Sequence, residues 1–406
     1  MNADKAAGNG HSNVTLPIYL DNHATTPLDS RVLEAMLPYL TAKFGNAASR
    51  NHSFGWEAQT AVEAARKQIA GAIGAHPNEI VFTSGATESD NLAIKGVAEA
   101  YAEKGNHIIT ALTEHTAVLD TCKHLEKRGF KVTYLPVQPD GLIDLERLKA
   151  AFTGQTILVS IMAANNEVGT LQPLEEIGTL CHERGALFHS DAVQALGKIP
   201  LNVDQMNLDL ASLTAHKLYG PKGCGALYVR DKVRLTALVD GGGHEHGMRS
   251  GTLNVPGIVG FAKAVAVAQA EMPEEGLRVA ALRDRLKDKL AAGLDQIRVN
   301  GSIERRLPGN LNVSFRFVEG EPLMLGLQDI AVSSGAACST EKIDASHVLK
   351  ALGLSDDDAQ CAIRFGIGRF NTEAEIDYVA GRVIEVVNSL RELSPMYEAR
   401  QQGSRA

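Results

Sequence analysis

Lys217 is the residue of this chain best placed for covalent chemistry. It follows the apolar run from Leu208 to Leu213 and stands between His216 and a turn that begins at Tyr219. A lysine at the end of a buried strand loses solvation, which lowers the pKa of its amine and makes it nucleophilic toward an aldehyde. Most isolated lysines lie on the surface, so the prediction of a Schiff-base lysine depends on the polar residues around it.

A turn of small residues, 84–90, follows one predicted strand and opens a helix. Free N–H groups and the helix dipole at such a turn bind phosphate, and Thr87 adds a hydroxyl. The spacing of a nucleotide P-loop is absent, and the same pattern is also common where a helix start only needs a cap. Thr214 and His216 would add donors from a second strand end. The segment 241–252 is too polar for a core, and we interpret it either as a loop reaching a phosphate or as a solvated crossover.

Other strand ends carry residues that suit an aromatic cofactor ring. Asp191 could pair with a protonated pyridine nitrogen, and Gln194 could donate to a phenolate oxygen of the ring. His115 could lie over the ring face and move protons near neutral pH. Asn166 lies at an edge where parallel sheets keep their ligands. Viewed alone, Asp191 fits a helix cap equally well.

Cys338 and Arg364 are the chemical residues of the C-terminal part. Cys338 lies among small and polar residues, which predicts a thiol on a mobile loop that carries a transferred group. Arg364 stands in an apolar strand and needs a carboxylate partner, either a structural Asp or Glu or a substrate. The remaining four cysteines are expected to be small buried hydrophobes: Cys122, Cys181, Cys224 and Cys361.

The bulk properties are those of a globular protein with a sizeable core. The chain has 406 residues, of which 44% are hydrophobic and 22% are charged, so no fibrous or disordered class is needed. A net charge of -8 argues against nucleic acid and anionic membranes as partners. No segment resembles a signal peptide or approaches the roughly 20 consecutive apolar residues of a membrane span. We therefore expect a cytoplasmic protein.

Strands and helices alternate along the first part of the chain, which predicts an α/β fold with a mostly parallel sheet between helices. The strands are expected at residues 79–82, 107–110, 131–135, 156–160, 186–189 and 225–229. The helices between them are expected at 57–73, 89–103, 117–128 and 174–184. Beyond Pro256 the pattern predicts a smaller α+β domain. Its helices are expected at 258–271, 277–294 and 373–393, and its strands at 310–317, 330–334 and 362–367.

These motifs resemble those of the cysteine desulfurases, in the group that includes the housekeeping and nitrogen-fixation enzymes of iron–sulfur assembly. The resemblance runs from about Ile18 to Tyr397, and the spacing from Cys338 to His347 is similar to that of the long-loop members. The segments that carry it are residues 19–27, 44–46, 83–91, 113–115, 165–167, 191–194, 216–217, 249–252 and 333–335.

The resemblance implies the fold of pyridoxal-phosphate-dependent transferases of type I, similar to aspartate aminotransferase. A large domain with a mostly parallel seven-stranded sheet would join a small α+β domain. We expect a flexible arm at 1–15, part of the small domain at 16–26, the large domain at 27–265 and the small domain with its cysteine loop at 266–406. It also implies a homodimer with its sites at the subunit interface.

Carried over residue by residue, the resemblance implies that Lys217 holds pyridoxal 5'-phosphate and, once L-cysteine frees it, removes the α-proton. Cys338 would attack the substrate sulfur and keep it as a persulfide, with His115 assisting proton transfer. Arg364 and Asn166 would hold the substrate carboxylate. The implied cofactor contacts are Ala86, Thr87, His115, Asn166, Asp191, Gln194, Thr214, His216, Lys217 and, across the dimer, Thr252 of the partner subunit.

The sulfur would pass to an iron–sulfur scaffold protein or to another acceptor. No metal site is expected, apart from transient ligation of an iron–sulfur cluster by Cys338. Two activities on the same scaffold remain alternatives, a selenocysteine lyase and an aminotransferase, and so does a catalytically silent subunit that keeps the fold. Aminotransfer needs no loop thiol, so Cys338 favours the desulfurase.

Overall fold

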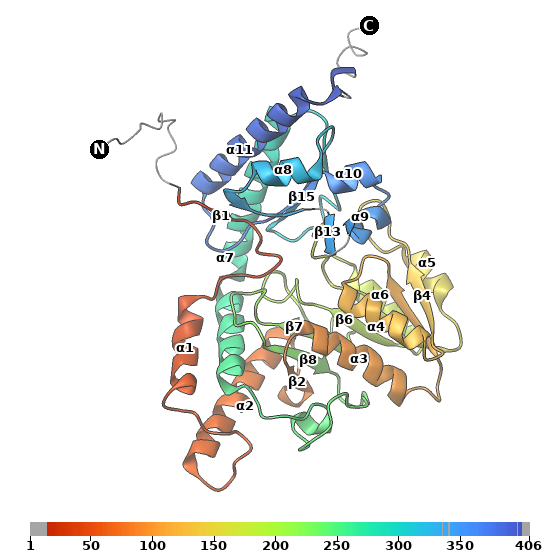
Figure 1. Ribbon diagram of the computed structural model, residues 1–406. Helices are drawn as coiled ribbons and strands as arrows, with labels where there is room; N and C mark the ends of the chain where they lie inside the picture. Colours follow the sequence, from red (N-terminus) through yellow and green to blue (C-terminus); the bar gives the residue numbers. More distant parts are fainter. Residues whose placement is uncertain (1–13, 335, 340–341, 396, 400–406) are drawn as a thin grey trace.

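The computed structural model describes residues 14–334, 336–339, 342–395 and 397–399, and for 336–339 and 342–344 it describes the backbone alone. The arm expected at residues 1–15 therefore lies almost entirely outside the described residues. Two bodies of unequal size are joined by one long helix (Figure 1). The domain boundaries expected from the sequence stay predictions.

A seven-stranded sheet forms the centre of the larger body, in the order β2-β8-β7-β6-β5-β3-β4. Neighbouring strands are parallel except where β8 pairs, since β8 runs antiparallel to both β7 and β2. This confirms the predicted mostly parallel sheet. The strands are β2 (Ile80–Thr83), β3 (His107–Ala111), β4 (Lys131–Leu135), β5 (Thr156–Ser160), β6 (Leu187–Asp191), β7 (Leu210–Thr214) and β8 (Gly225–Val229).

Helices cover both faces of this sheet, and the strands alternate their side chains between two cores. Ile108 and Leu158 pack in the core beneath α3 and α4, while the next residues along, Ile109 and Val159, pack in the core with α2, α6 and α7. Alternation with period two follows from the pleat, so these strands are apolar throughout and their ends are left for polar side chains. The helices are α1 (Ser30–Leu40), α2 (Ser53–Ile73), α3 (Ala86–Ala100), α4 (Thr116–Glu126), α5 (Leu145–Ala151), α6 (Leu174–Glu183) and α7 (Val255–Gly293). Two 3-10 turns are η1 (Pro77–Glu79) and η2 (Glu245–Gly247).

The smaller body is built on a four-stranded antiparallel sheet in the order β12-β15-β10-β9. The strand expected at 330–334 is instead two short strands in different sheets, because β11 pairs with β1 near the N-terminus and β12 pairs with β15. The strands are β1 (Ile18–Tyr19), β9 (Ile297–Val299), β10 (Asn310–Phe315), β11 (Ile330–Ala331), β12 (Ser333–Ser334), β13 (Ala336–Ser339), β14 (Lys342–Ala345) and β15 (Ala362–Gly366). The helices are α8 (Gly320–Gly326), α9 (His347–Ala351), α10 (Asp356–Gln360) and α11 (Glu373–Glu392).

Helix α7 corrects the prediction of two separate helices at 258–271 and 277–294. It is continuous through Pro273. Its first half, with Phe261, packs in the core of the larger body, and its second half, with Leu286, packs in the core of the smaller one. The apolar pattern breaks near the proline because the helix changes partner there, and Figure 1 shows α7 running from α1 to α11.

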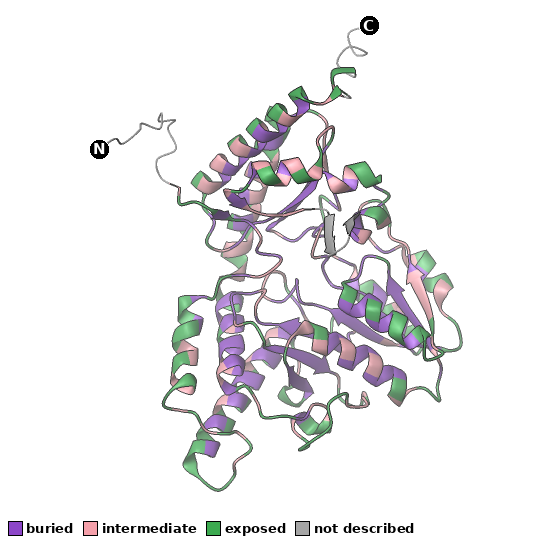
Figure 2. Cartoon of the chain, viewed as in Figure 1, coloured by how far each residue is buried: buried purple, intermediate pink, exposed green. Residues whose placement is uncertain are grey.

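Within the described residues α7 is also the one helix that is long and apolar enough, over 18 residues, to cross a membrane by length and composition. Of that window, 56% is buried inside the protein. A core helix of a globular protein meets the same test, and Figure 2 shows the buried residues along α7. We expected no segment as long and apolar as a membrane span. By length and composition alone, α7 shows that this expectation is wrong.

Candidate active site at the carboxyl edge of the sheet

The carboxyl ends of the parallel strands bring most of the predicted residues to one edge. Thr87 follows β2, His115 follows β3, Asn166 follows β5, Asp191 ends β6 and Lys217 follows β7. Thr87 and His115 line one open cavity of about 320 Å³ between the starts of α3 and α4. Residues spread over 130 positions of sequence thus share a sheet edge because successive parallel strands all end there.

Lys217 is largely enclosed, and its ammonium nitrogen is held by backbone carbonyls. Lys217 Nζ donates to the carbonyl oxygens of His23 and Ala24, both at 2.6 Å. Burial lowers the pKa of Lys217 to about 8, the charge of Arg364 lowers it further, and Asp191 opposes the shift. About a tenth of the amine is therefore unprotonated and able to react at pH 7, far more than for a lysine of ordinary pKa.

Asp191 is buried, and its carboxylate is oriented from its own turn. Its Oδ1 accepts the N–H of Val193 at 3.0 Å. Burial raises the pKa of Asp191, while that N–H and the nearby His115 and Lys217 oppose the rise. A carboxylate in such a place pairs strongly with any cation brought to it, including a protonated ring nitrogen.

Two more buried acids lie behind Asp191. Both oxygens of Asp90 and one of Glu114 have no hydrogen-bond partner of good geometry within the described residues. Burial raises the pKa of both carboxyl groups well above the usual range, and the charge of Asp191 adds to it. Because Asp191 accepts the Val193 N–H and lies near the charge of Lys217, Asp191 is the acid that ionises more readily, and the proton is kept on Asp90.

The start of α3 is suited to an anion. Gly85 caps the helix with φ 154°, and no side chain occupies the cap. The N–H groups of Ala86 and Thr87 lie in this first turn, at the positive end of the helix dipole. Glu88, one residue further, is paired with Arg249 at 2.8 Å. This pair ties the segment 241–252 to the helix start, close in sequence to Thr252, which is exposed.

Two residues predicted to bind phosphate already have partners. The hydroxyl of Thr214 donates to the carbonyl of Cys224 at 3.2 Å. His216 Nδ1 is 3.1 Å from the hydroxyl of Thr25. Burial and then the charges of Lys217 and Lys222 lower the pKa of His216 to about 4. His216 is therefore a neutral imidazole at pH 7, and any contact it makes with an anion is a hydrogen bond.

Arg364 has the structural carboxylate partner that the sequence left open. Its Nη2 donates to Asp21 Oδ1 at 2.7 Å and to the Ser333 hydroxyl at 2.8 Å, and its Nη1 donates to the Asn166 carbonyl at 3.0 Å. The buried Nε of Arg364 has no partner within the described residues. The guanidinium thus joins the two bodies next to Asn166. These bonds use three of its five N–H groups, which leaves one on Nη1 and the one on Nε.

Cys338 lies in a short strand where the sequence predicted a loop. Strand β13 pairs with β14, and Cys338 stands opposite Ile343. Ser333, five residues before Cys338, pairs with Arg364. Five residues of chain reach at most about 17 Å, which limits how far Cys338 can lie from Ser333, the residue paired with Arg364. The other four cysteines are buried, as expected, and burial raises the pKa of each thiol.

Four charged or ionisable residues at this edge were not predicted as site residues. Asp21 and His23 meet partners 343 and 171 positions away, Lys198 meets Gln194 four positions away, and the buried oxygens of Asp90 have no hydrogen-bond partner within the described residues. Asp21 and His23 lie in the segment 19–27 and Asp90 lies in 83–91, and both segments carry the resemblance, so they were the available signal. The residues are Asp21, His23, Asp90 and Lys198.

Comparison with known families shows which family the chain belongs to. A model of the family "Aminotransferase class-V" matches residues 18–379. The match covers most of the chain, so the protein belongs to the class V aminotransferase family. This agrees with the sheet order and the lysine at its carboxyl edge.

Two similar relatives within that family carry the name of a single activity. The chain is 60% identical over 390 residues to "Cysteine desulfurase IscS" of Anaeromyxobacter sp. (strain Fw109-5), which covers 96% of each chain. It is 55% identical over 394 residues to "Cysteine desulfurase IscS" of Rickettsia conorii, which covers 97% of this chain and 96% of the other. Among solved structures it resembles a NifS-like protein, with a TM-score of 0.86 and 42% identity over 92% of this chain and all of the other. It also resembles DndA from Streptomyces lividans, with a TM-score of 0.74 and 37% identity over 85% of this chain and 98% of the other.

Proposed function

We propose that the protein is a pyridoxal-phosphate-dependent cysteine desulfurase. It converts L-cysteine to L-alanine and leaves the sulfur as a persulfide on Cys338. The observation that carries the proposal is the desolvated amine of Lys217 on the same sheet edge as the buried carboxylate of Asp191. The names of relatives at 55% and 60% identity support the same activity.

The residues present fit this cofactor. Lys217 offers an amine of lowered pKa, the start of α3 offers uncapped N–H groups for a phosphate, and Asp191 offers a carboxylate for a ring nitrogen. When bound, the cofactor supplies an electron sink conjugated to the α-carbon of the amino acid. These three groups thus suit the aldehyde, the phosphate and the ring nitrogen of the cofactor.

The protein side chains supply binding and proton transfer. Arg364 and Asn166 hold the substrate carboxylate, and the freed amine of Lys217 takes the α-proton. The Cys338 thiolate attacks the substrate sulfur, so that an S–S bond forms while the substrate C–S bond breaks. The carbon fragment keeps the electron pair of the broken bond and becomes alanine when it is protonated. His115 accepts the Ala117 N–H at Nδ1, so its neutral ring carries a proton on Nε2 that it can donate.

The pocket is completed by a second copy of the chain in this proposal. Apolar side chains are exposed together on α1, on the following loop and at the start of α2: Leu37, Leu40, Phe44, Phe54 and Trp56. Figure 2 shows this part of α1 and α2 as mainly exposed. A patch of this kind is typical of a protein interface, and a homodimer would bring Thr252 of the partner subunit toward a phosphate. Sedimentation should give the mass of two chains, and the mass of one chain would contradict the dimer.

Borohydride reduction tests the central claim. Reduction of the purified protein loaded with pyridoxal 5'-phosphate, followed by peptide mapping, should place a pyridoxyl group on Lys217. Lys217→Ala should lose the label, while Lys222→Ala, an exposed lysine five residues on, should keep it. A label on another lysine, or no label, would contradict the assignment. Identification of the protein that receives the persulfide sulfur would then separate iron–sulfur assembly from other sulfur transfer.

A further inference from the structure

His23 has an imidazole that the proposed reaction does not use. It lies in the loop between β1 and α1 and is 2% exposed. Its Nδ1 is 3.1 Å from Gln194 Oε1, and its carbonyl accepts both Gln194 Nε2 at 2.9 Å and Lys217 Nζ at 2.6 Å. Its Nε2 is buried and has no partner within the described residues. The ring is therefore fixed on one side and unsatisfied on the other.

The partners of Gln194 determine which way its amide points. Gln194 Nε2 faces the His23 carbonyl, which only accepts. Gln194 Oε1 faces Lys198 Nζ at 2.8 Å. Burial lowers the pKa of Lys198 to about 7, and below that pH the group is an ammonium, which only donates. The two constraints come from opposite ends of the amide and agree, so the oxygen of Gln194 must face the His23 ring.

The orientation of this amide in turn determines the proton on His23. An amide oxygen only accepts, so the neighbouring Nδ1 of His23 must carry the hydrogen. Burial lowers the pKa of His23 well below its ordinary value, and the charges of Lys198, Arg364 and Lys217 lower it further. The ring is therefore neutral, and its Nε2 is a bare acceptor.

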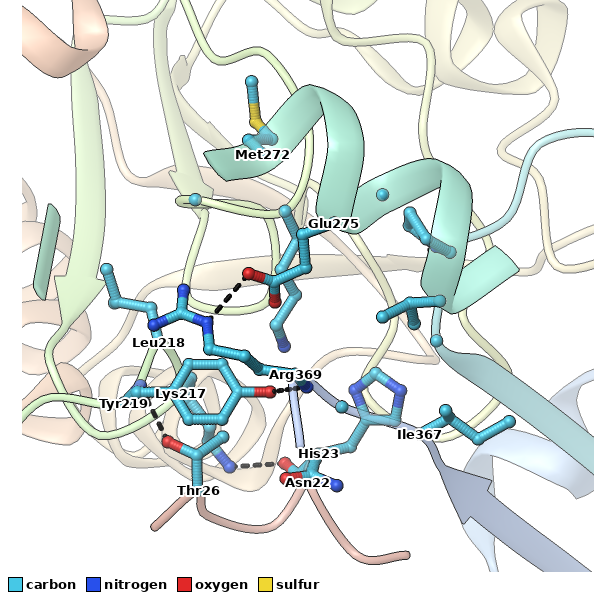
Figure 3. A pocket seen from close by; sticks show the side chains of 17 residues that line it. Asn22, His23, Thr26, Lys217, Leu218, Tyr219, Met272, Glu275, Ile367 and Arg369 are labelled. Atoms are coloured by element: carbon cyan, nitrogen blue, oxygen red, sulfur yellow. Dashed lines mark hydrogen bonds and ion pairs between the residues drawn. The ribbon is translucent and has the colours of Figure 1, made fainter. Parts of the chain in front are cut away.

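We propose that His23, Gln194 and Lys198 form one positioning network behind Lys217, in which His23 is held as the Nδ1–H tautomer. His23 also lines a cavity of about 40 Å³ together with Lys198, Lys217, Glu275 and Arg369 (Figure 3). Glu275 and Arg369 pair with each other at 2.8 Å, and Gln194 is the side chain that joins His23 to Lys198.

The network affects Lys217 because Gln194 and Lys217 both donate a hydrogen bond to the His23 carbonyl. The His23 carbonyl receives Lys217 and Gln194 together, so the loop carrying it is held on one side by the amide that Lys198 orients. His23 and Lys198 are therefore positioning residues that set where the reactive amine rests. We expect them to affect the lysine and the cofactor ring without touching the substrate.

Nitrogen NMR of the purified full-length protein labelled with 15N-histidine tests the tautomer directly. The signal lost in His23→Asn identifies His23 among the 13 histidines. At about pH 6, where free histidine is largely protonated, we expect a neutral ring with hydrogen on Nδ1. A hydrogen on Nε2, or a doubly protonated ring, would overturn the proposal. This measurement does not depend on the proposed activity.

A pair of variants tests whether the network positions the site. Asparagine places an N–H donor where Nδ1 stands, so His23→Asn keeps the bond to Gln194, whereas leucine cannot make it. Loss of one buried hydrogen bond predicts about tenfold weaker binding of pyridoxal 5'-phosphate for His23→Leu, and His23→Asn should stay within about threefold of the native protein. Equal losses in both variants would overturn the positioning role. This arm rests on the proposed function, and a native protein that binds no cofactor would contradict that function while leaving the NMR result valid.

Discussion

The two sides of the site are held in different ways. On the larger body, Lys217 and Asp191 follow buried strands of a seven-stranded sheet and are fixed by backbone carbonyl and N–H groups. On the smaller body, Cys338 lies in a hairpin that, in the described part of the chain, forms a sheet of two strands only. A cofactor needs groups held in place before it binds, whereas a group that carries sulfur must reach two partners. The contrast therefore separates a fixed binding side from a carrier side.

Removal of the thiol should give the largest effect. Cys338→Ala cannot form a persulfide, so alanine production from L-cysteine should fall by roughly 1000-fold or more, while the bound cofactor keeps its absorbance. Cys361→Ala is a matched control because this cysteine is buried in the core of the smaller body. Unchanged turnover in Cys338→Ala would favour an aminotransferase. A selective loss with cysteine but not with selenocysteine would favour a selenocysteine lyase.

Asp191 and Asp90 test the fixed side. Asp191→Asn removes the negative charge that pairs with the ring nitrogen, and the rate should fall by about 100-fold or more. Asp90→Asn replaces a protonated carboxyl with a neutral group of similar shape, so we expect a change within about threefold. Steady-state kinetics of both variants checks the pair. Equal losses would show that Asp90 is ionised and would contradict the proton assignment.

Much of this edge was predictable from the sequence, for a physical reason. Apolar runs followed by polar residues mark strand ends, and parallel strands bring those ends together, which is how Asp191 and Lys217 were found. The partners of these residues were not predictable in the same way. Asp21 meets Arg364 across 343 positions and His23 meets Gln194 across 171, so no local pattern signals either contact. Helix α7 was divided in two because a proline coincides with a change of packing partner.

Arg364 lies where the two sides meet, and its effect should be intermediate. Arg364→Gln removes a charge-assisted contact to the substrate carboxylate, so KM for L-cysteine should rise by about 10- to 100-fold with a smaller change in kcat. Ser333→Ala removes one hydrogen bond that the same guanidinium donates to an uncharged hydroxyl, and it should change KM by only about threefold. A fall in kcat with KM unchanged would indicate that Arg364 acts through the joint between the bodies and not on the substrate.

The pH dependence of cofactor loading gives the finest test of the fixed side. The ordinary pKa of a lysine is 10.5, and in this fold that of Lys217 is lowered to about 8. The amine reacts only when unprotonated, so the rate of imine formation with added pyridoxal 5'-phosphate should rise about tenfold per pH unit below pH 8. It should then level off above pH 8 instead of rising further toward pH 10.5. Stopped-flow absorbance measures this rate, and a midpoint near 10 would mean that the burial around Lys217 does not desolvate its amine.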